Sequence, residues 1–144
     1  MSRSNYQIFR PIATRWMDND IYGHVNNVVF YSWFDTAVNA VLIEAGLLDV
    51  ATGSVIGLVV ESGCRYHRPV AFPQSVEAGL RIGRLGNSSM EWKIGIFTND
   101  TDDPAVTGFL VHVLVDRVGR RPADLPAAWR ETLERFVAPD SIQG

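Results

Sequence analysis

Residues 14–27 read TRWMDNDIYGHVNN and lead directly into VVFYSWFDTAVNAVLIEA, residues 28–45. We predict a helix from about Asn26 to Ala45, because Gly46 is well placed to end it in a left-handed conformation. Apolar residues cover most of the circumference of this helix, and the polar strip is narrow: Ser32, Asp35, Thr36 and Asn39. Other elements must enclose a helix with so little polar surface. The pattern therefore favours a sheet curled around one central helix.

Most of the remaining chain alternates between apolar and polar residues and is predicted to form strands. The first strand is expected to lie at an edge of the sheet, because Pro11 has no amide hydrogen to donate. The predicted strands are 7–16, 55–67, 75–85, 90–98 and 105–116, and a short helix follows at 126–136. A run of four strands after one long helix indicates an α+β fold with a largely antiparallel sheet.

The composition is that of an ordinary globular protein of one domain, residues 1–144, with 47% apolar and 20% charged residues. A net charge of −3 argues against non-specific binding of nucleic acid. The polar N-terminus lacks a secretory signal, and no apolar run is long enough to span a membrane. With Cys64 as its single cysteine, the chain cannot form an intrachain disulfide. We expect a cytoplasmic protein.

Two aspartates, Asp18 and Asp20, lie in the polar loop that precedes the long helix. An aspartate in a loop most often accepts hydrogen bonds from nearby backbone amides. Here the loop leads to a helix N-terminus, where unpaired amides stabilise an anion, while partial burial disfavours the charge. A carboxylate between these two influences is a candidate general base or nucleophile.

The residues that follow suit the binding of a carbonyl group. Gly23 allows a tight turn and close approach of a ligand. Asn26 and Asn27 are natural N-cap residues, and the free amides of the first turn near Asn27 are candidates to polarise a carbonyl oxygen. His24 is a candidate to bond to substrate or to Asp20, although a loop histidine is more often structural.

The run RWMDNDIYGHVNNVVFYSWFD, residues 15–35, closely resembles the signature of hotdog-fold acyl-CoA thioesterases of the 4-hydroxybenzoyl-CoA thioesterase type. A weaker resemblance continues through CRYHRPV (64–70), GNSSM (86–90) and VDRVGRRPADLP (115–126). It implies a five-stranded antiparallel sheet wrapped around one long helix. It also implies hydrolysis of acyl-CoA without metal or cofactor, by dimers joined edge to edge and often paired into tetramers.

The resemblance also implies roles for individual residues. Asp20 falls on the catalytic carboxylate, which acts as nucleophile or general base, and the Asn27 amide falls on the donor that polarises the thioester carbonyl. Gly23 and His24 fall on the loop that shapes the site. Asp18 would structure that loop.

Several further residues are candidates for substrate binding. Two basic clusters are equally placed to meet the phosphates of CoA, one at Arg65, His67 and Arg68 and the other at Arg117, Arg120 and Arg121. Both are as well explained by solvated strand ends. Glu61 is a candidate second carboxylate supplied across a dimer. The histidines show no metal-ligand spacing, so no metal site is expected.

Two other functions remain open from the sequence. A hotdog-fold hydratase or dehydratase would act on enoyl or 3-hydroxyacyl thioesters, and a non-catalytic module would bind acyl-CoA. The acyl group itself is not indicated, because Phe30, Trp33 and Phe34 could line an aromatic or an aliphatic pocket but are better explained as simple core.

Overall fold

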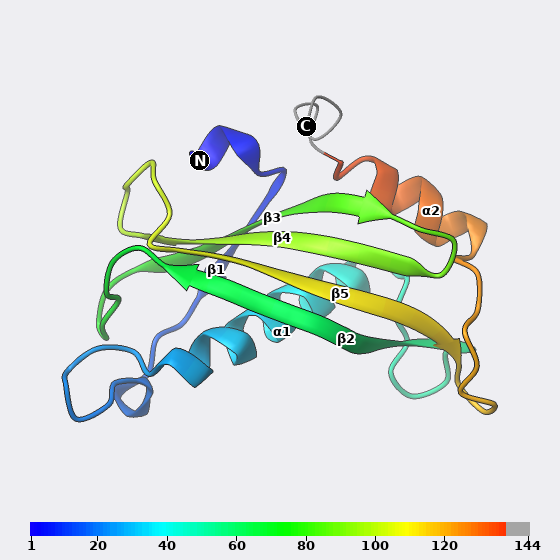
Figure 1. The fold of residues 1–144 in the computed structure, drawn as a ribbon, viewed down its shortest axis with the longest axis horizontal. Coiled ribbons are helices and arrows are strands. Elements are labelled where there is room, and N and C mark those ends of the chain that lie inside the picture. The colour runs from blue at the N-terminus through cyan, green and yellow to red at the C-terminus, as the bar shows by residue number, and fades with distance from the viewer. Residues whose placement is uncertain (138–144) are drawn as a thin grey trace.

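The computed structural model describes residues 1–137 and shows one antiparallel sheet with a long helix across one of its faces (Figure 1). The strands lie in the order β1-β3-β4-β5-β2. Their bounds are Ile8–Ile12 (β1), Val55–Tyr66 (β2), Val76–Leu85 (β3), Ser89–Thr98 (β4) and Val106–Asp116 (β5). The helices are α1 (Asn27–Glu44) and α2 (Ala127–Glu134). This is the predicted hotdog fold, with the predicted order of elements.

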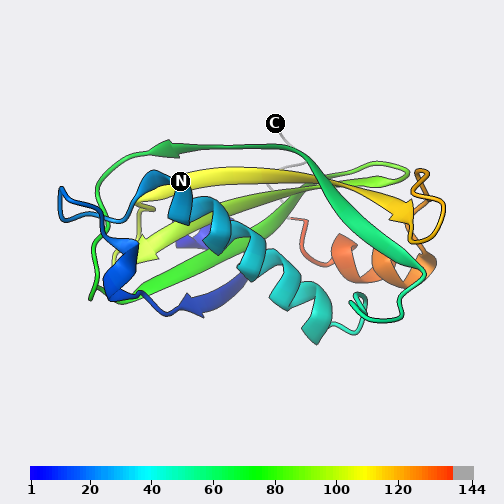
Figure 2. The ribbon, with the colours of Figure 1, turned by 90° about the horizontal axis from the view of Figure 1, so that it is seen from below.

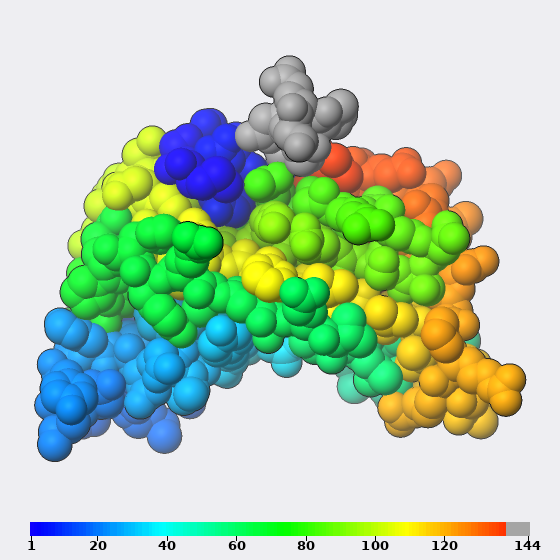
Figure 3. Space-filling view, in the orientation of Figure 1, coloured from blue at the N-terminus to red at the C-terminus, as the bar shows by residue number. Residues whose placement is uncertain are grey.

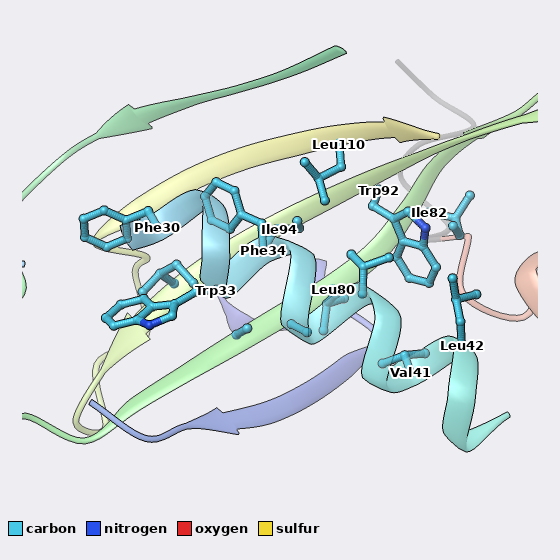
Figure 4. Packing of buried hydrophobic residues seen from close by; sticks show 14 of the residues in the cluster. Phe30, Trp33, Phe34, Val41, Leu42, Leu80, Ile82, Trp92, Ile94 and Leu110 are labelled. Atoms are coloured by element: carbon cyan, nitrogen blue, oxygen red, sulfur yellow. The ribbon is translucent and has the colours of Figure 1, made fainter. Parts of the chain in front are cut away.

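The two faces of the sheet differ in what covers them. The face that packs against α1, here called the core face, carries the alternate apolar residues of β3, β4 and β5, including Leu80, Trp92 and Leu110 (Figure 4). The opposite face, here called the outer face, is partly covered by the N-terminal segment through Tyr6. The helix α2 closes the end of the core beside β3, where Trp129 and Leu133 are buried.

The helix α1 buries one broad side and exposes the other. Its buried residues are Phe30, Trp33, Phe34, Ala37, Val38, Val41 and Leu42. Removing an aromatic side chain as large as Phe34 from water contributes about 1.5–3 kcal/mol. The sheet leaves a stripe beside the polar strip uncovered, where Val28 and Ile43 are 65% and 50% exposed. One curled sheet therefore encloses only part of the helix (Figure 2).

The structure confirms the predicted edge position of the strand with Pro11 and the predicted helix end at Gly46, but the predicted end of the first strand was wrong. Pro11 lies in the edge strand β1, and Gly46 adopts a φ of 74° just after α1. The first strand, however, ends at Ile12 and not at Trp16. Its pairing with β3 stops there, and the chain then turns in a short 3-10 helix, Trp16–Asp18.

No helix within residues 1–137 is both long enough and apolar enough to cross a bilayer.

Candidate active site

The loop before α1 is anchored by a buried carboxylate. Asp18 is fully buried and accepts hydrogen bonds from the Arg15 backbone amide at 2.8 Å and from the Arg15 guanidinium at 2.9 and 3.0 Å. Its own carbonyl accepts from the amide of Asn26 at 2.9 Å. These bonds tie both ends of the loop together, so Asp18 has the structural role expected for it.

The next aspartate lies in a tight turn. The carbonyl of Asp20 accepts from the Gly23 amide at 3.0 Å, and the Asp20 amide donates to the His24 carbonyl at 2.9 Å. Gly23 has a φ of 82°, which side chains rarely tolerate. One carboxylate oxygen of Asp20 accepts from the Tyr22 amide at 2.9 Å. Within residues 1–137 the other oxygen has no hydrogen-bond partner.

The N-terminus of α1 keeps one amide free. Asn26 is the N-cap, and its side-chain oxygen accepts from the Val28 amide at 3.1 Å. The Val29 amide donates to the Asn26 carbonyl at 3.0 Å. In the described part of the chain the Asn27 amide has no acceptor. The first turn of α1 therefore presents one unpaired donor with the positive end of the helix dipole behind it.

Asp20 and Asn27 line the same hollow, which has a volume of about 480 Å³. Its apolar walls are Phe30 and Val70, and His24, His67 and Arg68 complete its polar rim. The amide of Val25 donates to the Val70 carbonyl at 2.7 Å and holds the loop against the connection from β2 to β3. The loop, the first turn of α1 and the connection from β2 to β3 meet at one end of the molecule (Figure 2).

A tyrosine that the sequence did not single out forms another wall of this hollow. The hydroxyl of Tyr66 donates to the Asn27 carbonyl at 3.3 Å, and its ring lies 5.6 Å from that of Phe30. Burial of the hydroxyl, and then the neighbouring Cys64, raises the pKa of Tyr66. The phenol therefore stays protonated at neutral pH and supports the first turn of α1. The alternation of β2 could have indicated this role, because it places Tyr66 on the opposite face of the sheet from Arg65.

The predicted substrate-binding residues are divided between the Asp20 hollow and the outer face of the sheet. His67 and Arg68 line the hollow with Asp20. The Arg68 guanidinium is already bonded to the Asp103 carboxylate at 2.7 Å. Arg65 and Glu61, which are opposite Thr107 and Val111 in the register, lie on the outer face. Within one chain the sheet separates them from Asp20.

The second basic cluster lies far from the hollow. Arg117, Arg120 and Arg121 follow β5, at the opposite end of the molecule from the loop that carries Asp20 (Figure 3). The Arg117 guanidinium donates to the backbone carbonyls of Val50 and Gly53, at 2.9 and 3.4 Å. Within one chain these arginines do not belong to the Asp20 site.

Cys64 is held beside α1. Its thiol donates a weak hydrogen bond to the Tyr31 hydroxyl at 3.6 Å. Within residues 1–137 no three histidine, cysteine, aspartate or glutamate side chains are grouped to hold a metal ion. The Asp20 hollow thus offers a carboxylate, a free amide, an apolar wall and the polar rim of His24, His67 and Arg68.

A sequence model of the thioesterase superfamily, 4HBT, matches residues 22–105. The chain belongs to this superfamily. It is therefore a thioester hydrolase with a hotdog fold.

Solved structures and one protein of similar sequence agree with this membership. The PA5185 protein of Pseudomonas aeruginosa is 51% identical, with a TM-score of 0.93 over 96% of each chain. A thioesterase of Thermus thermophilus, complexed with coenzyme A and Zn, is 30% identical with a TM-score of 0.75, over 92% of this chain and 95% of its own. YsmA of Bacillus subtilis is 21% identical over 131 residues, which are 91% of this chain and 88% of YsmA.

Proposed function

We propose that this thioesterase hydrolyses acyl-CoA to the free acid and CoA, with Asp20 as its catalytic residue. The observation that carries the proposal is that the free oxygen of Asp20 and the unpaired Asn27 amide line one hollow at the N-terminus of a helix. That the related Thermus thermophilus thioesterase is complexed with coenzyme A supports the choice of thiol.

The proposed reaction places the thioester carbonyl oxygen on the Asn27 amide. Negative charge grows on that oxygen as the carbonyl carbon is attacked, and a fixed N–H donor at a helix N-terminus stabilises it more in the transition state than in the substrate. The Tyr66 hydroxyl bonds to the Asn27 carbonyl and holds this peptide in place. The apolar side of the acyl group lies against Phe30 and Val70.

Two routes use the same carboxylate. In one, Asp20 removes a proton from water, and the resulting hydroxide attacks the carbonyl. In the other, Asp20 attacks the carbonyl itself, expels the thiolate and forms a mixed anhydride that water then hydrolyses. In both, the C–S bond breaks, one water is consumed and the thiolate takes up a proton.

Replacing Asp20 with asparagine tests the proposal. Asp20→Asn should lower kcat by about 10³-fold or more, because general-base and nucleophilic roles both need the charged oxygen. The measurement is thiol release from a panel of acyl-CoA substrates, with the thermal midpoint checked in parallel. Asp100→Asn, in an exposed turn, is the matched control. An Asp20→Asn enzyme with near-wild-type turnover would contradict the assignment.

Oxygen-18 distinguishes the two routes. In a single turnover in labelled water, nucleophilic attack followed by addition of water at the Asp20 carbonyl of the anhydride leaves an unlabelled Asp20 oxygen in the acid and the label in Asp20. Label in Asp20 therefore establishes the nucleophilic route. General-base catalysis delivers the label directly to the acid. Mass spectrometry of the peptide that contains Asp20 makes the decision.

The same panel tests the two other functions that the sequence left open. A hydratase would consume enoyl-CoA by adding water to the double bond, without releasing thiol. A binding module would retain acyl-CoA without turnover. Absence of thiol release across short, long and aromatic acyl groups would overturn the proposed activity.

We further propose a homodimer formed through the free edge of β2. This strand has twelve residues, and Leu58, Val59 and Val60 are 39%, 47% and 61% exposed on it. A long apolar edge invites pairing with a second copy. Such a pair would bring Glu61 and Arg65 close to the partner. Light scattering should give a dimer for the wild type and a shift to monomer for Val60→Glu, whereas a monomeric wild type would refute it.

A further inference from the structure

The outer face of the sheet carries a second hollow of about 480 Å³, on the side away from α1. Neither the superfamily match nor the proposed catalytic role of Asp20 gives it a purpose. The side chains that form it are Tyr6, Arg65, Arg81, Lys93, Thr107 and Phe109. We call it the outer hollow.

The register of the strands explains why these side chains meet. Arg81 of β3 is directly opposite Lys93 of β4, and Lys93 is directly opposite Phe109 of β5. In the neighbouring row Thr107 is opposite Arg65 of β2. Directly opposed side chains on one face have Cβ atoms about 5 Å apart, and diagonal neighbours about 7–8 Å. The fold therefore places Arg81 beside Lys93, and Arg65, on the other side of β5 from Lys93, borders the same hollow.

The charge of the outer hollow is not balanced by the chain. Arg81 forms no ion pair within residues 1–137, and its Nε is buried without a hydrogen-bond partner. Arg65 likewise has no carboxylate partner in the described part of the chain. Only Lys93 is paired, with Glu91 at 3.3 Å. Because like charges directly opposite each other destabilise a sheet, an anion bound here would relieve the repulsion.

The outer hollow also has an aromatic surface. The ring of Phe109 lies so close over Gly63 that a Cβ at that position would be 2.8 Å from the ring. The Lys93 ammonium is 5.4 Å from the centre of the same ring. On another side the hollow is bounded by Tyr6, which is buried. A flat apolar ring beside cations suits a ligand that combines an aromatic base with phosphates.

A smaller hollow of about 340 Å³ lies between this region and the Asp20 hollow. It shares His67 with the Asp20 hollow and Thr107 with the outer hollow. His67 Nε2 lies 2.9 Å from the Thr107 hydroxyl, so the two residues are in contact. The three hollows thus follow one another around the end of β2, from the core face to the outer face.

We propose that the outer hollow binds a phosphorylated nucleotide, with Arg81, Lys93 and Arg65 on the phosphates and Phe109 against the base. The nucleotide has two chemical sources. One is the nucleotide end of the acyl-CoA substrate, here called the handle, and the other is a free nucleotide. The smaller hollow of about 340 Å³ matches the first source, because it lies between the outer hollow and Asp20, where a thioester arm would run. The assignment of the acyl-CoA handle to the outer hollow rests on the proposed function.

The test uses adenosine 3′,5′-bisphosphate and calorimetry, with the full chain and its Asp20→Asn variant. Both should bind it saturably. Arg81→Gln and Lys93→Gln should each weaken binding about tenfold, because each removes one charge-assisted contact. Arg84→Gln is the matched control, since Arg84 is an exposed arginine on the same strand and outside the hollow. Absence of binding by the wild type, or equal binding by Arg81→Gln, overturns the proposal.

A kinetic comparison identifies the source. If the handle occupies the outer hollow, Arg81→Gln raises KM about tenfold for acyl-CoA and leaves KM unchanged for the acyl-pantetheine that lacks the nucleotide. If Arg81→Gln abolishes bisphosphate binding but changes neither KM, the handle assignment is overturned and a separate nucleotide site is established. A wild type without thioesterase activity would refute the proposed function alone, because calorimetry needs no turnover.

Discussion

The Asp20 hollow and the outer hollow have the same volume and lie on opposite sides of one sheet, yet they offer different chemistry. The first presents a carboxylate oxygen and an unpaired amide. The second presents cations and an aromatic ring. The difference follows from the backbone beneath each hollow. Strand amides in the middle of a sheet are used in the ladder, so a sheet face offers only side chains. The first turn of a helix leaves amides unpaired.

This contrast suggests a division of work. A free backbone donor is fixed in position and suits charge that develops during reaction. Long basic side chains on a sheet are mobile and suit a ligand that is already charged. The following predictions, from the largest expected effect to the smallest, separate the two hollows experimentally.

Asp18 supports the Asp20 hollow but not the outer hollow. Asp18→Ala should lower the free energy of unfolding by about 2–3 kcal/mol, since it removes a buried carboxylate that accepts three hydrogen bonds from Arg15. The cost stays below that of a fully buried pair because Arg15 remains partly solvated. Urea unfolding measures it, with the exposed Asp124→Asn as control. Below the transition, nucleotide binding at the outer hollow should be unchanged.

His112 tests whether water and protons reach the core face of the sheet. It is 3% exposed, and burial lowers its pKa, an effect that the nearby Asp35 opposes. Between its lowered folded pKa and about pH 6.5 the unfolded chain therefore binds up to one more proton than the folded chain. Stability falls as the pH decreases through this window, by up to about 1.4 kcal/mol per pH unit. Urea unfolding between pH 5.5 and 7.5 should show a shallower dependence of the unfolding free energy on pH for His112→Gln than for the wild type. Equal slopes would show that His112 is accessible to protons in the folded state.

Two glycines of β2 give a matched pair across the sheet. Gly63→Ala should destabilise the protein by about 1 kcal/mol and weaken nucleotide binding, because the new Cβ would displace the Phe109 ring. Gly57→Ala should be close to neutral, since its Cβ would meet His112 at an ordinary 3.5 Å. Calorimetry and urea unfolding of both variants make the comparison. Nucleotide binding unaffected by Gly63→Ala would remove Phe109 from the site.

Salt should distinguish the hollows without mutation. Raising NaCl from 0.05 to 0.5 M shortens the screening length, so KM for acyl-CoA should rise about threefold. The KM for acyl-pantetheine and both kcat values should hardly change. A parallel rise in both KM values would mean that the salt acts on the Asp20 hollow.

Much of the fold was accessible to sequence reasoning because its signals are local. The apolar circumference of residues 28–45, Gly46 and the alternating strands predicted the elements in their correct order. The end of the first strand was missed, because it depends on how far β3 runs beside it and on the Asp18–Arg15 contacts, which alternation does not encode.

For the same reason, the proximity of the loop residues of the candidate site could be predicted from the sequence, whereas the placement of the basic residues could not. Asp20, Gly23, His24 and Asn27 lie within one continuous loop, so their proximity follows from the chain. The basic residues were grouped by their nearness in sequence, which places Arg65 with His67 and Arg68. Arg65 is still within β2 and faces the outer side of the sheet, whereas His67 and Arg68 lie beyond the end of β2 and line the Asp20 hollow.

The sequence alone determined that the chain is a hotdog thioesterase with a carboxylate-bearing loop before a buried helix, because the pattern and the motif are each continuous. Only the tertiary structure decided that the Asn27 amide is unpaired, that Tyr66 lies against it, and that Arg81, Lys93 and Arg65 form one cluster. These three cations come from separate strands, and strand register, which arises from packing between distant segments, brings them together.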